Sequence, residues 1–170
     1  MKTKLYTLLL LIVSTAAFSQ RKTVAELYKT DLFEAAIFPE SYNDILLSNN
    51  RFTPTKEDVE KAEISLIKDL SKINYMEINQ SNSPVIHKNL DKYCRQYFGY
   101  TDMNGDRVLL INCFWKKNQK EDYRNFLNRY INVFDGGSFY WNIKYNITKN
   151  KLFDLVVNGY SQTKRAVSKV

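Results

Sequence analysis

The clearest fold signal in this sequence is the segment YFGYTDMNGDRVLLINCF, residues 97–114. Asn104-Gly105 separates two runs rich in aromatic and β-branched residues, the strongest short-range signal for a β-hairpin. The dipeptide suits a two-residue type I′ turn because both of its residues tolerate a positive φ. This turn predicts that Asp102 lies opposite Arg107 and that Tyr100 lies opposite Leu109.

A second hairpin is predicted at residues 140–157. Apolar and polar side chains alternate from Tyr140 to Ile147, so this strand has one face of each kind. A three-residue loop at 148–150 predicts the pairs Tyr145–Phe153, Ile143–Leu155 and Trp141–Val157, with Lys144 opposite Asp154. Another strand is expected at Tyr130–Phe134, joined to this hairpin through Asp135-Gly136-Gly137-Ser138.

Helical patterns precede the strands. Thr55 and Asp58 resemble a capping box, and apolar residues at helical spacing follow, which predicts a helix over about 56–71. The spacing of Ile86, Leu90 and Tyr97 predicts a second amphipathic helix over about 84–96. A short helix is expected at 31–37, ended by Pro39.

The expected architecture is a single α+β domain at residues 20–170, in which 20–51 has the least regular pattern. Two amphipathic helices would pack on one face of an antiparallel meander of four or five strands, with a cystatin-like outline. That outline is a likeness of shape and implies no function. A chain of this length buries enough surface for one core without added metals or many disulfides.

The N-terminus has the pattern of a cleaved signal peptide. Lys2 and Lys4 precede the apolar run 8–13, and small residues end at Ser19, which predicts a signal over residues 1–19. The apolar run is too short to span a membrane. No Cys stands at the cleavage point for lipid attachment. The sequence therefore predicts export to the periplasm or the medium, with no transmembrane segment after cleavage.

The charge balance favours some partners over others. The 25 Lys and Arg residues exceed the 18 Asp and Glu residues, and the formal net charge of +7 falls to +5 when Lys2 and Lys4 are removed. A mild positive charge favours anionic partners such as phospholipids or acidic glycans. We expect no nucleic-acid partner for an exported protein; a protein or glycan partner is expected, and the sequence does not predict the oligomeric state.

Several short motifs carry a resemblance, namely Thr53–Val59, Arg95–Tyr100, Asn104–Asp106, Phe134–Ser138 and Val157–Gly159. With the signal ending in Ser19-Gln20, they resemble small exported proteins of Bacteroidetes-type bacteria, a group that is itself uncharacterised. The resemblance covers most of the mature chain. It implies a periplasmic or secreted location and identifies no catalytic residue.

Little in the sequence points to catalysis. It has one His, and none of the common nucleophile-elbow, metalloprotease or phosphate-loop motifs occurs. His87 and Cys94, seven residues apart on the expected helix, would be too far apart to act as a dyad. We therefore expect a non-enzymatic binding protein of the bacterial envelope, with no cofactor and no metal. The alternatives are a carboxylate-dependent hydrolase of an envelope polymer and a carrier of an apolar ligand.

The two cysteines allow two interpretations. Cys94 and Cys113 would form a disulfide if both faced the core in an oxidising compartment. They would otherwise be two buried free thiols that act as small apolar residues.

Candidate binding residues lie on the predicted outer face of the second hairpin. Tyr140, Asn142 and Lys144, with Asn158 opposite Tyr140, place an aromatic ring beside amides and a cation. Asp135 and Ser138 flank two glycines whose backbone N–H groups could face a partner. The alternatives are a solvated sheet face and an ordinary glycine turn.

Overall fold

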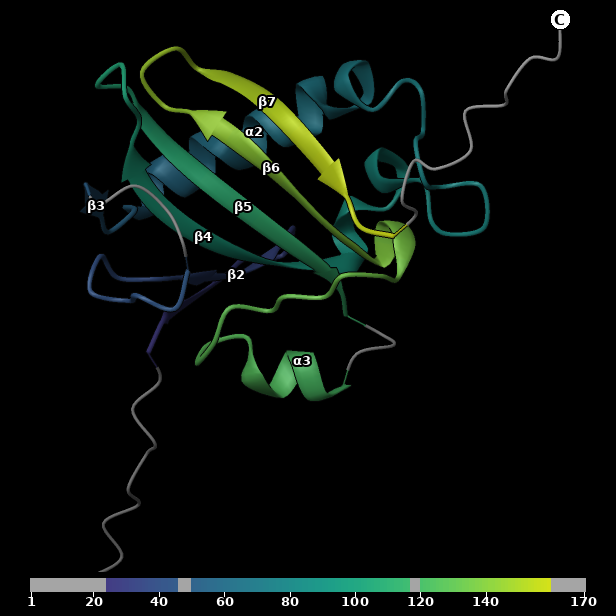
Figure 1. Cartoon of the computed structure of the whole chain (residues 1–170), viewed down its shortest axis with the longest axis horizontal. Helices are drawn as coiled ribbons and strands as arrows, with labels where there is room; N and C mark the ends of the chain where they lie inside the picture. Colours follow the sequence, from purple (N-terminus) through teal and green to yellow (C-terminus); the bar gives the residue numbers. More distant parts are fainter. Residues whose placement is uncertain (1–23, 46–49, 117–119, 160–170) are drawn as a thin grey trace, which may run out of the picture.

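The computed structural model describes residues 24–45, 50–116 and 120–159 (Figure 1). The predicted signal peptide lies outside these residues. The strands are β1 (Glu26–Lys29), β2 (Glu34–Ile37), β3 (Arg51–Phe52), β4 (Tyr93–Thr101), β5 (Arg107–Trp115), β6 (Tyr140–Asn146) and β7 (Lys151–Val157). The helices are α2 (Lys56–Ile73) and α3 (Lys120–Asn125), with short 3₁₀ turns at Ile86–Lys88, Leu90–Lys92 and Gly137–Phe139.

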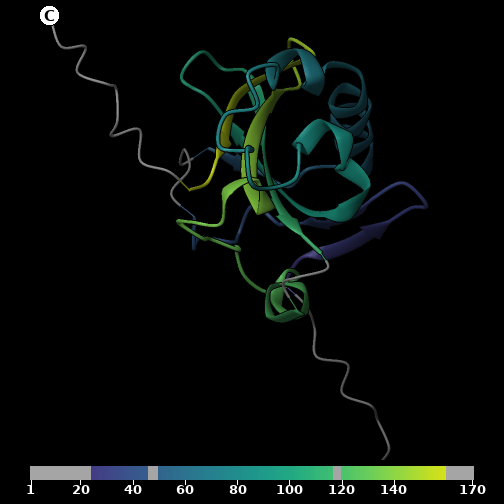
Figure 2. The ribbon, with the colours of Figure 1, turned by 90° about the vertical axis from the view of Figure 1, so that its right-hand side faces the viewer.

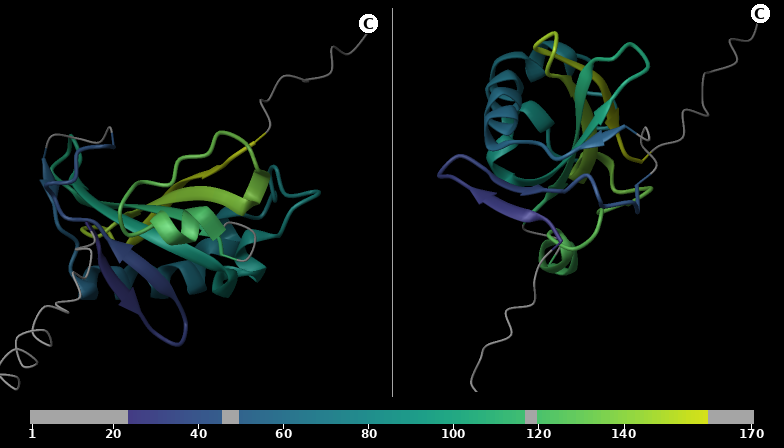
Figure 3. Two further views of the ribbon diagram at one scale, coloured as in Figure 1. Left: turned by 90° about the horizontal axis from the view of Figure 1, so that it is seen from below. Right: turned by 90° about the vertical axis from the view of Figure 1, so that its left-hand side faces the viewer.

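The seven strands form one mixed sheet. Its order is β1-β2-β4-β5-β6-β7, and β3 pairs with the end of β4. All neighbours are antiparallel except β2 and β4, which are parallel. The α+β class is confirmed, but the prediction of a four- or five-stranded antiparallel meander is wrong. The N-terminal segment adds the β1–β2 hairpin, seen in purple in Figure 3, and so extends and mixes the sheet.

The predicted helix at 84–96 is wrong. Its first part forms two 3₁₀ turns, and the remainder belongs to β4, the strand that pairs with β2, β3 and β5. Residues 93–99 of β4 are all buried because both faces of the sheet are covered. In such a strand the polar–apolar alternation disappears, so the apolar residues matched a helical spacing by chance.

Two further expectations fail for related reasons. Residues 34–37, expected to be helical, form β2, whose four residues are all buried beside β4. Residues 130–134, expected to form a strand, have no regular structure. They lie across the sheet instead, where the buried Gln96 and Asn112 bind the backbone of Ile131 at 2.8–2.9 Å.

The helix predicted at 56–71 is confirmed as α2, which continues to Ile73. Thr55 and Asp58 form the reciprocal capping box, with both hydrogen bonds at 3.1 Å. Asp58 also pairs with Arg107 of β5 at 3.1 Å, and this pair ties the start of the helix to the sheet. Asn74 caps the other end, where its backbone N–H donates to the carbonyl of Leu70.

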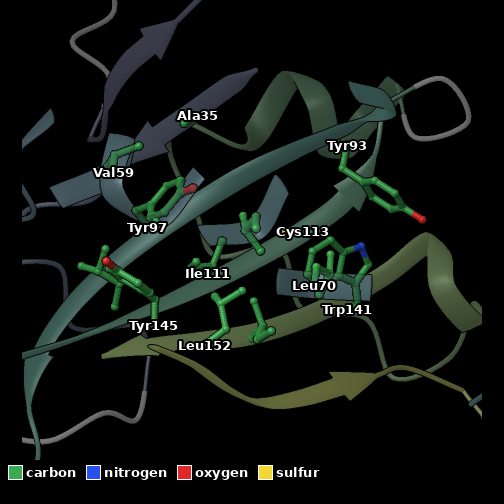
Figure 4. Packing of buried hydrophobic residues seen from close by; sticks show 14 of the residues in the cluster. Ala35, Val59, Leu70, Tyr93, Tyr97, Ile111, Cys113, Trp141, Tyr145 and Leu152 are labelled. Carbon is green, nitrogen blue, oxygen red and sulfur yellow. The ribbon is translucent and has the colours of Figure 1, made fainter. Parts of the chain in front are cut away.

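The two helices lie on different faces of the sheet (Figures 1 and 2), and this corrects the expectation of two helices on one face. α2 buries Val59, Leu66 and Leu70 against β4, β5 and β6, in the cluster that Figure 4 shows. On the other face, Phe98 and Phe114 are covered by Phe126, which follows α3, and by Phe38 and Tyr42.

The first hairpin exists with a different turn. Residues 102–106 form the loop, and Thr101 pairs with Arg107 while Tyr100 pairs with Val108. The predicted pairs Asp102–Arg107 and Tyr100–Leu109 are therefore wrong by one residue. The Asp102 carboxylate accepts hydrogen bonds from the backbone N–H groups of Asn104 and Asp106, at 2.8 and 2.9 Å. This Asx turn closes a longer loop than the type I′ turn would.

The second hairpin is predicted correctly at one end only. Trp141 pairs with Val157 as expected, and the backbone N–H of Asn158 donates to Tyr140. A bulge then shifts the register, so that Tyr145 pairs with Leu152 and not Phe153, and the predicted pair Ile143–Leu155 is not formed. Asp154 has a φ of 54° in the bulge, and its carboxylate still binds Lys144 at 2.6 Å.

The two cysteines are free and buried, and they lie on opposite faces of the sheet. Cys94 pairs with Phe114, whereas Cys113 pairs with Arg95. Adjacent residues of a strand point to opposite faces, so the two side chains point away from each other. Of the two interpretations, the structure shows buried free thiols, and burial raises the pKa of the Cys94 thiol to about 12.

A buried charge pair lies between α2 and the sheet. Arg95 Nε lies 2.8 Å from Glu63 Oε1, off the direction of its N–H bond, and Tyr97 donates its hydroxyl to the same oxygen at 2.6 Å. The other guanidinium nitrogens donate to the carbonyls of Tyr93 and Leu90, at 2.9 and 3.0 Å. Burial raises the pKa of the Glu63 carboxyl, and Arg95 opposes that rise. Each charge is therefore tolerated only while the other is present.

We predict that Arg95→Met lowers the free energy of unfolding by about 3–5 kcal/mol, because it leaves the Glu63 carboxylate buried without a cation. The double variant Arg95→Met/Glu63→Gln recovers more than half of that loss, since the glutamine is neutral and still accepts from Tyr97. Urea denaturation of the three proteins measures both effects. Equal losses in the single and double variants would contradict a coupled pair.

Candidate functional site

A groove lies between the end of α2 and the edge strand β7. Its volume is about 430 Å³, within the range of small ligand sites. One wall is the segment that follows α2, and the other is the last part of β7. The lining residues are Ile73, Asn74, Tyr75, Met76, Glu77, Ile78, Asn79, Leu155, Val156 and Val157.

The wall that follows α2 exposes large apolar side chains. Tyr75 is 75% exposed, Met76 63% and Ile78 46%. On α2 itself, Ile64 and Ile67 are also exposed and lie one turn apart on the helix surface. Clustered apolar side chains of this size are uncommon on the surface of a monomer, and they mark binding surfaces.

The segment that carries these side chains, residues 74–80, is held by a pair of buried amides. We call it the α2 loop. Asn74 donates to Gln80 Oε1 at 2.9 Å, and Gln80 donates back to Asn74 Oδ1 at 2.6 Å. Gln80 Oε1 also accepts the backbone N–H of Ile86 at 2.8 Å, and Gln80 Nε2 donates to the carbonyl of Ile78 at 3.2 Å. These hydrogen bonds hold the backbone of the α2 loop in one conformation. Its exposed apolar side chains therefore have fixed positions.

The backbone of the α2 loop is strained at two positions. Glu77 has a φ of 46° and Asn79 a φ of 60°, in the left-handed region that side chains other than glycine enter at a cost. Asn79 donates to the carbonyl of Val157 at 3.4 Å and so joins the two walls of the groove. The Glu77 carboxylate pairs with Lys88. The lining therefore offers apolar surface and one paired charge.

The opposite wall belongs to the last strand in the order of the sheet. Leu155 and Val157 pack against the core beneath α2, while Val156 is 46% exposed. The bulge at Asp154 interrupts the pairing of β7 with β6. Bulges and charged residues at an edge strand oppose pairing with other chains, so the groove is better suited to side-chain contacts than to an added strand.

The predicted outer-face residues separate into two groups. Tyr140 is buried, and its hydroxyl donates to Asp122 at 2.7 Å; burial and this carboxylate raise its pKa. Asn142 and Lys144 are half-buried on the same face, and Lys144 is paired with Asp154. The Asn158 side chain donates to the carbonyl of Val133, so this amide group is already bonded within the protein. The four residues therefore do not form one open recognition column.

The glycine loop also has structural roles. Ser138 is fully buried, and its hydroxyl binds Ser83 and the carbonyl of Pro84. Asp135 is exposed. Gly159 follows β7 and lies against this loop, so that a Cβ on Gly159 would be 2.8 Å from the nitrogen of Gly137. The motifs at 134–138 and 157–159, which are separate in the sequence, are therefore in contact where the chain crosses itself.

Away from the groove, most of the described carboxylates are paired with cations. These ion pairs are with lysine or arginine side chains, such as Asp106 with Lys149 and Glu34 with Lys116. Glu63, whose pKa is raised, lies in the core with Arg95 and is not part of the lining of the groove. In the described ranges, no group of three or more His, Cys, Asp or Glu side chains could hold a metal ion.

Sequence reasoning missed the groove. Residues 74–80 lie between the two helices that the sequence predicts, and the polar run at 79–84 indicates no more than a break between them. The available signal was the apolar residues Tyr75, Met76 and Ile78 ahead of that polar run. That signal becomes informative only when β7, about 80 residues later in the chain, is known to lie beside the loop.

Comparison of the chain with protein families, curated proteins and solved structures gives no match. Within the part of the chain that the structure describes, no helix is both long enough and apolar enough to cross a membrane.

We predict that Gly159→Ala destabilises the protein more than Gly105→Ala. Both glycines have a positive φ, of 76° and 82°, but nothing lies within 4 Å of a Cβ on Gly105. Gly105→Ala should cost about 1 kcal/mol for the backbone alone, and Gly159→Ala about 1–3 kcal/mol more for the clash with Gly137. Thermal or urea unfolding measures the difference. Equal losses of unfolding free energy in the two variants would show that the backbone around Gly137 moves to accept the added Cβ.

Proposed function

We propose that this is an exported, non-enzymatic binding protein of the bacterial envelope, and that the groove between the α2 loop and β7 binds an apolar segment of a partner protein. The observation that supports this most directly is the exposure of Tyr75, Met76 and Ile78 on a loop held by buried amides. A protein does not gain stability by fixing such side chains in water. A bound apolar partner would shield these side chains from water.

The chemistry of the groove favours an uncharged occupant. Glu77 is the charged residue of the lining, and it is already paired with Lys88. Both amide hydrogens of Asn74 are bonded within the protein, to Gln80 and His87. The groove therefore has few free polar groups to bind the hydroxyls of a glycan. Tyrosine and methionine, in contrast, are enriched at protein interfaces because they bury much area and adapt in shape.

The extent of the apolar surface favours a protein over a small molecule. Ile64 and Ile67 are exposed on α2, the helix that ends at the groove, so large apolar side chains are also exposed outside the 430 Å³ of the groove. Small ligands are usually bound in a cavity that buries most of their surface. A groove flanked by an exposed helix face is typical of peptide or protein recognition.

The charge distribution along the chain agrees with a neutral partner for the groove. All 18 acidic residues lie between Glu26 and Asp154, an interval that holds an equal number of basic residues. After removal of residues 1–19, the net charge of +5 comes from the two ends of the chain, from Arg21, Lys22, Lys164, Arg165 and Lys169. Any attraction to anionic envelope components would therefore act through the ends and not through the groove.

We predict that peptides selected from a random phage library on the purified protein are rich in apolar and aromatic residues and bind the groove. Met76→Lys should weaken their binding at least about tenfold, because it places a charge in an apolar contact. The matched control is Met103→Lys at the tip of the first hairpin, where the methionine is fully exposed. Isothermal calorimetry with the synthesised peptides gives both affinities.

Two results would contradict the proposed groove. Selected peptides that bind Met76→Lys as tightly as the original protein would place the interface elsewhere. A stoichiometric lipid or other apolar small molecule co-purifying with the protein, and lost in Met76→Lys, would identify a carrier instead.

Export has a separate test. We predict that protein recovered from the envelope or the medium begins at Gln20. We also predict that both thiols are alkylated after unfolding without a reductant, because Cys94 and Cys113 are free. Intact-mass spectrometry before and after alkylation measures both features. A chain that retains residues 1–19 would contradict the signal peptide.

A further inference from the structure

The single histidine of the chain contacts the amide pair that holds the α2 loop. His87 lies in the 3₁₀ turn Ile86–Lys88, and its Nδ1 is 3.1 Å from Asn74 Nδ2. Asn74 uses its other amide hydrogen on Gln80 Oε1. The histidine thus completes a network whose other members are the two buried amides and the backbones of Ile78 and Ile86.

The hydrogen-bond pattern fixes which groups donate. The backbone N–H of Ile86 can only donate, so the Gln80 atom that faces it is the oxygen. Asn74 must then present its NH₂ group to Gln80 Oε1 and its oxygen to Gln80 Nε2. The same NH₂ group faces His87, so Nδ1 must accept. The network therefore requires a neutral imidazole with its proton on Nε2.

A protonated imidazole cannot complete this network, because both of its nitrogens donate and neither accepts. Protonation would set the Nδ1–H of His87 against the N–H of Asn74. The amide pair cannot turn over to relieve this, since the oxygen of Gln80 is held by the N–H of Ile86. Either the histidine moves away or the α2 loop opens, and in both cases Asn74 loses a hydrogen bond while buried.

The charged groups around His87 are paired with one another. In its own turn, Lys88 pairs with Glu77 of the α2 loop. At the end of α2, Lys72 pairs with Asp69, and in the next 3₁₀ turn Lys92 pairs with Asp91. None of these described ion pairs includes His87.

We propose that His87 is a pH-sensitive latch on the groove, in which protonation of the imidazole releases the α2 loop and weakens binding of the partner. Imidazole is the side chain that changes charge between about pH 5 and 8, a range that exported proteins meet. The loss of the hydrogen bond between Asn74 and His87 on protonation follows from the hydrogen-bond pattern alone. The effect on binding rests on the proposed function of the groove.

The first test is an NMR titration of the protein from about pH 8 to about pH 5. At the high end, the ring nitrogen shifts should show Nδ1 unprotonated. As the ring becomes charged, the side-chain amide signals of Asn74 and Gln80 should shift with the same midpoint. Hydrogen-exchange protection in residues 75–80 should fall by about tenfold, the effect of one lost hydrogen bond.

Two variants separate the latch from a general effect of acid. His87→Asn keeps an acceptor oxygen near the position of Nδ1 and does not titrate, so protection of the α2 loop should stay constant over the same pH range. Lys88→Ala removes the neighbouring ion pair with Glu77 but keeps the imidazole, and its pH response should match that of the original protein. If His87→Asn does not fold, the titration of the unaltered protein still tests the latch, because the amide signals of Asn74 and Gln80 must shift with the same midpoint as the ring.

The latch is overturned if the ring becomes charged while the signals of Asn74 and Gln80 stay fixed, or if the ring stays neutral down to about pH 5. Binding is measured with the selected peptides at both ends of the range. Affinity should fall by about tenfold on acidification in the original protein and stay constant in His87→Asn. Failure of Met76→Lys to weaken binding would contradict the groove, whereas a loop that ignores protonation would contradict the latch alone.

Discussion

The structure depends on the burial of both faces of the β4–β5 pair. Each strand has seven consecutive buried residues, so each face needs its own cover. α2 covers one face, and the chain around α3 and residues 126–140 covers the other. This requirement also explains the buried polar side chains. Arg95 faces α2 and needs Glu63, whereas Gln96 faces the other way and binds the carbonyls of Phe126 and Arg129.

The groove lies beyond the end of α2, where that helix no longer covers the sheet. α2 stops at Ile73, and the chain must then return to β4 past the edge strand β7. The α2 loop makes that return with buried amides, positive φ angles and exposed apolar side chains. A connection selected only for stability would bury or replace those side chains. The proposed pH-dependent binding rests on this combination of buried amides, an apolar surface and a histidine bonded to those amides.

The binding residues predicted around β6 show why local patterns do not predict burial. Tyr140 and Ser138 are polar-tipped residues in a strand and a turn, and such residues are usually exposed. Here both are buried, because residues 126–139 fold back over the sheet and Ser83 reaches the glycine loop. Lys144 pairs with Phe153 in the register and not with Asp154 as predicted, but its long side chain still reaches the Asp154 carboxylate across the bulge.

The sequence by itself determined the features that depend on neighbouring residues: the capping box and extent of α2, the existence of both hairpins, and the α+β class. Local hydrogen bonds and side-chain spacing are sufficient for these features. Only the tertiary structure decided that β2 lies parallel to β4, that residues 93–96 extend as a strand, and that the α2 loop faces β7. Each of these depends on contacts between segments far apart in the chain, which one segment's pattern does not encode.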